Sequence, residues 1–346
     1  MKIFNLEYQY MRWSESPYVM DERVCIYLNL SKNDTRVRVL DDLDVEGGLL
    51  QLIHYLPKEM HLNKPPEGVE DCRGLVFFVP FNLDEPVKLL ARSFPHTPEV
   101  VLLSSEQKWH CVNCGSNNKA EFVQCAACKF DRPVSSTTLI KEKIIEFAPT
   151  SAVVAHEGTI LRLFNFNGKW YYSTHRKING LRSRWTGDTF GRIFEKILPN
   201  FDHTVLNTDY CYVLLLEDVH TGLVCSDIGN GNVYHTFTID MQTGNLVKPL
   251  NVIGGLAEII KPDTESILNK VRSVNPMKEC GVLLKNNKGE YLKILNSKYC
   301  AARVFLNNEP SLGIRYLELK LYNQHNNLAQ LLPRGKEKYE TIERLL

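Results

Sequence analysis

The sequence predicts an α+β fold in which antiparallel sheets are flanked by helices. Short apolar runs alternate with polar residues and are bounded by Asn-Gly, Lys-Gly or Thr-Gly turns, which is typical of strands joined as hairpins. Other segments repeat their apolar residues with the period of a helix. A hydrophobic content of 44% with 23% charged residues indicates a folded chain.

Strands are expected where the alternation of apolar and polar residues is clearest. They are residues 24–30, 75–79, 87–92, 152–165, 169–174, 210–216, 234–240, 281–285 and 291–295. Helices are expected at residues 47–55, 139–147, 189–198, 263–271 and 316–332. In the second of these helices Glu and Lys are interleaved, as on a solvated helix face.

Size and charge leave the partners open. A chain of 346 residues holds one large domain or two ordinary ones. Its 41 basic and 40 acidic side chains give a formal charge of +1, so nucleic acid can be attracted only by a local patch. Residues 1–13 lack a basic segment followed by an apolar core, and no run of about 18 apolar residues occurs. We therefore expect a cytoplasmic or nuclear protein with no membrane partner.

Four of the cysteines form two CxxC pairs, Cys111/Cys114 and Cys125/Cys128. Each pair can clasp a metal ion from a tight turn, and the intervening residues suffice for a hairpin that closes a tetrahedral four-sulfur site. The sequence therefore predicts a structural zinc ion. The other six cysteines are irregularly spaced and are expected to be buried free thiols in a reducing compartment: Cys25, Cys72, Cys211, Cys225, Cys280 and Cys300.

Trp109 and Asn118 complete a pattern with these cysteines that resembles the small zinc fingers named after Ran-binding protein. Members of that family bind single-stranded RNA, ubiquitin or other proteins. The RNA binders usually place an aromatic residue and arginines where this chain has Lys119, Glu121 and Phe122, and the ubiquitin binders usually have Thr-Phe where it has Gly115 and Ser116. The resemblance thus implies a binding module of unnamed ligand, with a structural or protein-docking role favoured.

Outside this segment, several motifs follow one another in a fixed order. They are 71–77 (DCRGLVF), 91–95 (ARSFP), 157–160 (EGTI), 168–174 (GKWYYST), 185–194, 281–282 and 289–299. This order resembles the phage-type RNA ligases, members of the covalent nucleotidyltransferase superfamily. The resemblance implies a nucleotidyltransferase (ATP-grasp-like ligase) domain of antiparallel sheets with flanking helices, ATP and Mg²⁺ as cofactors, and RNA or DNA as substrate.

The chemistry of that family starts at a lysine whose amine attacks the α-phosphate of ATP. At the matching position this chain has Ala155, which cannot form the adenylate, so no catalytic residue is assigned. The neighbouring His156 could form a phosphoramidate, but on an extended segment it would face away from the pocket. A lysine supplied from elsewhere, such as Lys169 or Lys177, is the other alternative.

Further family positions have also lost charge. The carboxylate of the third motif aligns on Leu215, with Glu217 two residues on, and that of the fourth aligns on Cys280, beside Glu279. The second lysine of the fifth motif is Leu295, and a lysine near Phe94 is His96. The loss of charge with retained strand character predicts a pseudoenzyme.

Retained residues give the candidate sites. The resemblance implies nucleotide or phosphate contacts for Arg73, Glu157, Arg176 and Lys293, while Ser173 is also retained. Basic residues interleaved with an aromatic could track a nucleic-acid backbone, and these candidates are Lys177, Arg182, Arg184 and Trp185.

The motifs divide the chain into an N-terminal part of the ligase-like domain (1–103), the inserted four-cysteine finger (104–138), the remainder of that domain (139–300) and a C-terminal helical segment (301–346). We expect a catalytically degenerate RNA ligase-like protein that binds nucleic acid or protein in a larger assembly. The alternatives are an active ATP-dependent RNA ligase or nucleotidyltransferase with an unusual nucleophile, and a zinc-dependent protein-interaction scaffold.

Overall fold

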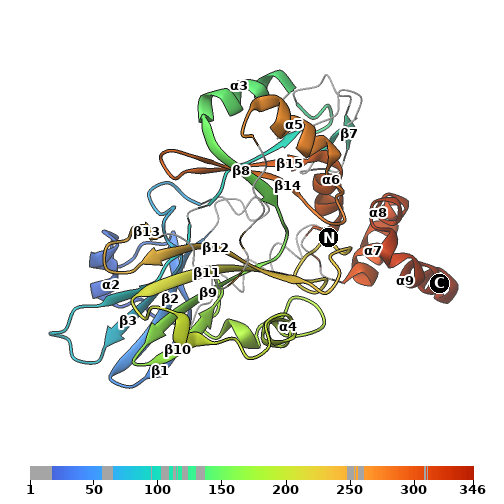
Figure 1. Cartoon of the computed structure of the whole chain (residues 1–346). Coiled ribbons are helices and arrows are strands. Elements are labelled where there is room, and N and C mark those ends of the chain that lie inside the picture. The colour runs from blue at the N-terminus through green and yellow to red at the C-terminus, as the bar shows by residue number, and fades with distance from the viewer. Residues whose placement is uncertain are drawn as a thin grey trace. The chain divides into compact units, whose positions relative to one another are not determined.

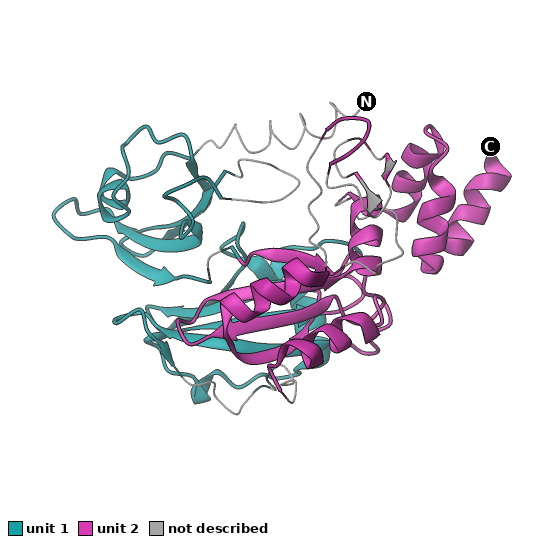
Figure 2. Ribbon diagram, turned by 90° about the horizontal axis from the view of Figure 1, so that it is seen from above, with its two compact units in different colours: residues 1–96, 159–216, 232–255 teal, residues 97–158, 217–231, 256–346 magenta. Residues whose placement is uncertain are grey.

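The computed structural model describes residues 18–56, 65–94, 96–102, 109–111, 114, 116–118, 124–129, 137–247, 253, 255, 261–307, 309 and 311–346. The chain divides into two compact units, coloured separately in Figure 2. The first comprises Met1–His96, Thr159–Leu216 and Asn232–Gly255, and the second comprises Thr97–Gly158, Glu217–Gly231 and Leu256–Leu346. Each unit is described by itself.

The first unit contains a four-stranded antiparallel sheet in the order β1-β2-β3-β4. Its strands are β1 (Val37–Val45), β2 (Gly48–Tyr55), β3 (Arg73–Pro80) and β4 (Lys88–Ala91). Gly47, at φ 81°, makes the turn from β1 to β2. Gly48 lies so close to β3 that a Cβ would come within 2.3 Å of the Val79 carbonyl oxygen, so only glycine fits there.

The same unit also contains a five-stranded sheet in the order β10-β9-β11-β12-β13. The strands are β9 (Thr159–Phe166), β10 (Lys169–Ser173), β11 (Tyr210–Glu217), β12 (Asn232–Asp240) and β13 (Leu246–Val247). The turn between β9 and β10 is Asn167-Gly168, with both residues at positive φ, as the sequence predicts for a hairpin. Figure 1 shows β9, β11 and β12 running side by side.

The apolar side chains of the two sheets meet in one core. Leu50, Leu52 and Val76 from the first sheet pack with Phe164 and Val213 from the second. On a second cluster lies helix α4 (Phe190–Ile197), whose Thr189 side chain accepts a hydrogen bond from the Arg192 N–H and so caps the helix. The unit also contains α2 (Glu22–Tyr27), η1 (Gly180–Arg182) and η2 (His203–Val205).

The second unit is built on a four-stranded sheet in the order β5-β15-β14-β8, in which β5 alone runs parallel to its neighbour. Its strands are β5 (Glu99–Leu102), β8 (Pro149–Ala155), β14 (Gly281–Asn286) and β15 (Tyr291–Asn296). Helices α3 (Thr137–Phe147) and α5 (Thr264–Ser273) pack their apolar residues on this sheet. Figure 1 shows the two helices next to it. Two short strands, β6 (Trp109–His110) and β7 (Asn117–Asn118), form a separate pair.

The C-terminal part of the second unit is helical. It consists of α6 (Ser297–Leu306), α7 (Leu312–Lys320), α8 (His325–Leu331), η3 (Pro333–Gly335) and α9 (Lys336–Leu345). The Asn296 side chain caps α6 by accepting hydrogen bonds from the backbone of Lys298 and Tyr299. Apolar residues of these helices share one buried cluster with Ala155 and Leu295 at the strand ends.

The α+β class with antiparallel sheets is confirmed, but two expected elements are wrong. Residues 24–30 were expected to be a strand, whereas residues 22–27 form α2. This helix begins at Glu22 because the Asp21 side chain accepts the Arg23 N–H at 2.8 Å. Residues 47–55 were expected to be a helix, whereas they form β2. Because β2 lies between two strands and is buried on both faces, its apolar residues do not alternate.

Two further expected elements are divided. The strand expected at 152–165 ends at Ala155 and resumes at Thr159 in a different sheet. The helix expected at 316–332 is broken at Asn323, which has φ 55° and separates α7 from α8. Strands β1, β5 and β13 were not expected. Helices α6 and α9 were not located individually, although residues 301–346 were expected to be helical.

Candidate functional site

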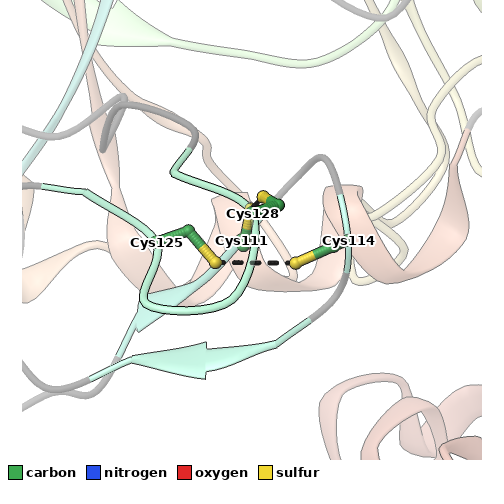
Figure 3. Close-up of side chains that lie close together, drawn as sticks. All are labelled: Cys111, Cys114, Cys125 and Cys128. Atoms are coloured by element: carbon green, nitrogen blue, oxygen red, sulfur yellow. Dashed lines mark hydrogen bonds between the residues drawn. The ribbon is translucent and has the colours of Figure 1, made fainter.

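The four cysteines of the CxxC pairs come together in the second unit (Figure 3). Their sulfur atoms all lie within 4.8 Å of one another, and the Sγ atoms of Cys111 and Cys128, and of Cys114 and Cys125, are 3.5 Å apart. Zinc held by four sulfurs at about 2.3 Å places the sulfurs about 3.8 Å from one another. The cluster therefore has the dimensions of a tetrahedral zinc site, and it can hold that metal.

Asn118 joins the two halves of this cluster. Its buried side-chain amide donates to the Ser116 carbonyl (3.0 Å) and to the Cys125 sulfur (3.5 Å), while its Oδ1 accepts the Ala126 N–H at 2.8 Å. One side chain therefore links the first cysteine-bearing hairpin to the turn that carries Cys125. This contact explains in physical terms why an asparagine accompanies the cysteines in the sequence pattern.

The surroundings of the sulfurs favour thiolates, the form that binds metal. Burial acts to raise the pKa of Cys125, but hydrogen bonds from the backbone N–H groups of Cys128 and Ala127 and from Asn118 outweigh it and lower the pKa to about 6. The Ser116 hydroxyl lowers the pKa of Cys114. The type of finger is not established by this geometry, and Gly115, Lys119, Glu121 and Phe122, which bear on its ligand, lie outside the described residues.

Ala155 occupies a closed position at the end of β8. It is 2% exposed and belongs to an apolar cluster with Val224, Cys280 and Leu295. Its carbonyl oxygen accepts the backbone N–H of Cys280 at 2.8 Å and the Cys280 thiol at 2.9 Å. Ala155, Cys280 and Leu295, three uncharged residues that the sequence singled out, therefore line one buried core.

Glu157 is held by groups of its own unit. Its Oε2 accepts the backbone N–H groups of Val224 and Cys225, both at 2.8 Å, and its Oε1 accepts the Tyr299 hydroxyl at 2.9 Å. A carboxylate with three such donors acts as a clasp between β8 and α6 through the loop at 224–225. Its assignment to a nucleotide stays a prediction.

Lys293, in the same unit, is half buried and faces an acidic partner. Its ammonium lies 3.9 Å from a carboxylate oxygen of Glu99, whose other oxygen pairs with Arg303 at 2.7 Å. Burial acts to lower the pKa of Lys293, but the nearby Cys280 and Glu99 outweigh it and raise the pKa. Lys293 therefore stays protonated within an ion-pair network, and its contact with phosphate stays a prediction.

Arg73 and Arg176, which the sequence places far apart, converge in the first unit. The link is Arg162, fully buried, which donates to the carbonyl oxygens of Gly74 and Thr174. Gly74 has φ 70°, and a Cβ there would lie 2.7 Å from the His175 Cα, so the two segments approach as closely as their backbones allow. Arg73 also lies over the Phe94 ring, 5.2 Å from its centroid.

This convergence is electrostatically unusual because it gathers cations around the buried His54. Burial and the charges of Arg176, Arg73 and Arg162 lower the pKa of His54 to about 3. The pKa of His175 is lowered well below its ordinary value for the same reasons, burial first. Both histidines are therefore neutral at pH 7. Sequence analysis did not single out Arg162 or His54, since neither belongs to a motif.

The four nucleic-acid candidates separate into two kinds. Lys177 pairs with Asp41 at 2.8 Å, and the same carboxylate accepts the Ile178 N–H at 2.8 Å, so Lys177 anchors its loop. Arg182, Arg184 and Trp185 are exposed, and Trp185 is 40% exposed. Among the described residues they have no hydrogen-bond or ion-pair partner.

His156 and Glu217 meet in the second unit, with His156 Nδ1 2.9 Å from Glu217 Oε1. Glu217, at the end of β11, is 1% exposed. The contact was not foreseen from sequence, because nothing in the spacing of residues 156 and 217 indicates that their side chains meet.

No helix in the part of the chain that the structure describes is long and apolar enough to span a membrane.

The described elements define an α+β protein with antiparallel sheets, and solved structures that resemble it include ATP-dependent ligases. An archaeal ATP-dependent RNA ligase has a TM-score of 0.48 and 11% identity, covering 89% of this chain and 77% of the other. A putative ATP-dependent DNA ligase from Aquifex aeolicus has a TM-score of 0.45 and 11% identity, covering 88% and 73%. No protein-family model matches the chain.

Two curated relatives are similar in sequence. The immediate-early protein ICP-46 homolog of Invertebrate iridescent virus 3 is 30% identical over 203 residues, which is 54% of this chain and 44% of that protein. The immediate-early protein ICP-46 of Frog virus 3 is 23% identical over 215 residues, covering 54% and 52%. The chain thus spans about half the length of the curated relatives that it matches.

Proposed function

We propose that the chain is a catalytically degenerate RNA ligase-like protein that binds nucleic acid or protein within a larger assembly. Its cysteine cluster holds a structural zinc ion, and its ligase-like domain surrounds the inserted finger at 104–138. The protein acts in the cytoplasm or the nucleus. The ordered motifs support the ligase-like part of this proposal, and the loss of the charged motif residues supports the degenerate part.

The observation that carries the proposal is the position of Ala155. A nucleophilic lysine must reach the α-phosphate of a nucleotide, whereas the Ala155 side chain lies in an apolar core. The positions of Cys280 and Leu295, where the resembled ligases have charged groups, are fully buried in the same core. Neutral side chains that pack together in this way stabilise the fold and provide no phosphate contacts.

The test is covalent labelling. Purified protein is incubated with ATP or GTP labelled at the α-phosphate, with Mg²⁺ or Mn²⁺, and then denatured. We expect no retained label while an active RNA ligase run in parallel is labelled. Label that survives denaturation would overturn the proposal.

A second candidate, an active nucleotidyltransferase, is favoured by one contact, the hydrogen bond between His156 and Glu217. A carboxylate on Nδ1 fixes the ring tautomer, so that Nε2 carries the lone pair, as in catalytic triads. Nε2 would attack the α-phosphorus of ATP, forming an N–P bond as the bond to pyrophosphate breaks.

The same labelling experiment separates the two candidates. The second candidate requires an acid-labile label that is lost in His156→Ala and reduced in Glu217→Gln. Lys169→Ala is the matched control, and it should label as the wild-type chain does. A label that persists in His156→Ala would refute His156 as the acceptor.

A further inference from the structure

A surface loop of the first unit exposes cationic and aromatic side chains to solvent. It comprises the end of η1 and the segment from η1 to α4, and it includes Arg182, Arg184 and Trp185. Large aromatic side chains are usually buried more deeply than Trp185, which leaves 40% of its surface in solvent. The loop therefore presents a flat apolar ring after two exposed arginines.

The backbone of this loop is fixed at its base. The Ser183 N–H donates to the Gly180 carbonyl at 3.0 Å, and the Ser183 carbonyl accepts the Phe190 N–H at 2.8 Å. Gly191 packs so closely that a Cβ would lie 2.9 Å from the Leu181 carbonyl oxygen. Ser183 is thereby held against the body while Arg182 and Arg184, on either side of it, are exposed.

The charges of the loop remain available for a ligand. Neither Arg182 nor Arg184 makes a hydrogen bond or ion pair to a described residue. The acidic residue nearest in sequence, Asp188, pairs instead with Arg192 at 3.4 Å. Lys177 differs, because Asp41 already binds it.

We propose that Arg182, Arg184 and Trp185 form a binding site for single-stranded nucleic acid, with one base stacked on Trp185 and the arginines on the flanking phosphates. This inference rests on the proposed function, because it names the ligand of the binding role proposed there. An unpaired base offers its face to an indole, and guanidinium groups bind phosphate through two parallel hydrogen bonds. A duplex hides its base faces, so the exposed indole favours single strands.

A protein partner is less well matched. Interfaces between proteins place an aromatic anchor in the centre of an apolar patch, whereas Trp185 follows two exposed arginines, Arg182 and Arg184. Single-stranded nucleic acid is a polyanion with flat apolar bases along its length, so it can bind the arginines and the Trp185 indole at once. The formal charge of +1 for the chain means that this attraction is local.

The experiment uses the full chain and fluorescently labelled 20-nucleotide single-stranded RNA and DNA, with a duplex of the same sequence. Affinity is measured by anisotropy, and stacking by quenching of tryptophan fluorescence. We expect Trp185→Ala to weaken single-strand binding about 5- to 100-fold. Trp185→Phe should retain most of the affinity, and Arg182→Glu with Arg184→Glu should weaken it at least as much as Trp185→Ala.

Two variants serve as matched controls, Lys88→Glu for an exposed cation and Tyr322→Ala for an exposed aromatic. Both should bind as the wild-type chain does. Wild-type affinity in Trp185→Ala and in the double arginine variant would overturn the inference. So would loop-dependent binding of polyglutamate without binding of single strands, which would indicate an acidic protein partner.

The labelling experiment separates this inference from the proposed function. If no nucleotide label forms and no single strand binds, the inference fails while the degenerate-ligase proposal stands. If label forms and single strands bind through Trp185, the degenerate-ligase proposal fails while the inference stands.

Discussion

Glu157 shows how a single carboxylate can join separate segments of the chain. The structure gives this carboxylate three hydrogen-bond donors from its own unit. These contacts stabilise the fold whether or not the carboxylate also contacts a nucleotide.

Replacing this carboxylate should therefore cost stability. We expect Glu157→Gln to lower the free energy of unfolding by about 1.5–3 kcal/mol, because an amide cannot accept at both oxygen positions. Urea unfolding measures the change, and Glu142→Gln on the exposed face of α3 is the control, expected to change it little. Equal stability of the two variants would contradict the clasp.

His54 provides a second prediction at this scale, concerning pH. Its pKa in the folded chain is about 3, below the ordinary value of 6.5. Between these values the unfolded chain binds a proton that the folded chain does not, so the free energy of unfolding falls as pH drops below 6.5. Each such histidine contributes up to about 1.4 kcal/mol per pH unit.

Unfolding measured from pH 7 to pH 5 tests this contribution. In His54→Gln the loss of stability on acidification should be smaller than in the wild-type chain, although the variant itself is less stable at pH 7. An unchanged dependence on pH would show that His54 is not held neutral in the fold.

Among the elements, the proposed zinc site gives a prediction about metal. The described core around it consists of the four cysteines, so in this proposal zinc supplies the folding energy of the segment. We expect one zinc per chain by elemental analysis, loss of that zinc in Cys128→Ser, and full retention in Cys300→Ser. Zinc retention in Cys128→Ser would contradict the four-sulfur site.

The loop after β10 gives a prediction that separates two kinds of contact. Asp41 accepts both the half-exposed Lys177 ammonium and the N–H of the buried Ile178. Lys177→Ala should lower the free energy of unfolding by about 0.2–1 kcal/mol, as expected for an exposed ion pair. Asp41→Ala should lower it by about 1–3 kcal/mol, since a buried N–H loses its acceptor. The reverse order in urea unfolding would show that the ion pair matters more than the backbone contact.

At the scale of the whole molecule, near neutrality limits how the chain can bind nucleic acid. With a formal charge of +1, only the displayed cations contribute, and the loop offers Arg182 and Arg184. We expect the logarithm of the association constant for a single strand to fall with the logarithm of salt concentration with a slope of about −1.4, from two phosphate contacts. A slope several times steeper in a salt titration would require a larger basic surface elsewhere.

Sequence reasoning located most strands of the three larger sheets because their apolar and polar residues alternate, and it located the four clustered cysteines because they stand in two CxxC pairs. It failed at β2, where burial on both faces removed the alternation, and at α2, where one capping aspartate decided the conformation. The candidate residues named from the motifs lie among the described residues, but the motifs did not indicate which residues they contact.

The sequence by itself determined the α+β class and the four-cysteine cluster, since each follows from residue type and local spacing. It also predicted that Ala155 stands where the resembled ligases have a nucleophilic lysine. Tertiary structure alone decided that Glu157 meets Tyr299, that His156 meets Glu217, and that Arg162 joins Gly74 to Thr174. It also decided that Lys177 is bound by Asp41 while Arg182 and Arg184 face solvent. Contacts between residues distant in the chain depend on how strands pair and helices pack, and local periodicity carries no information about that pairing.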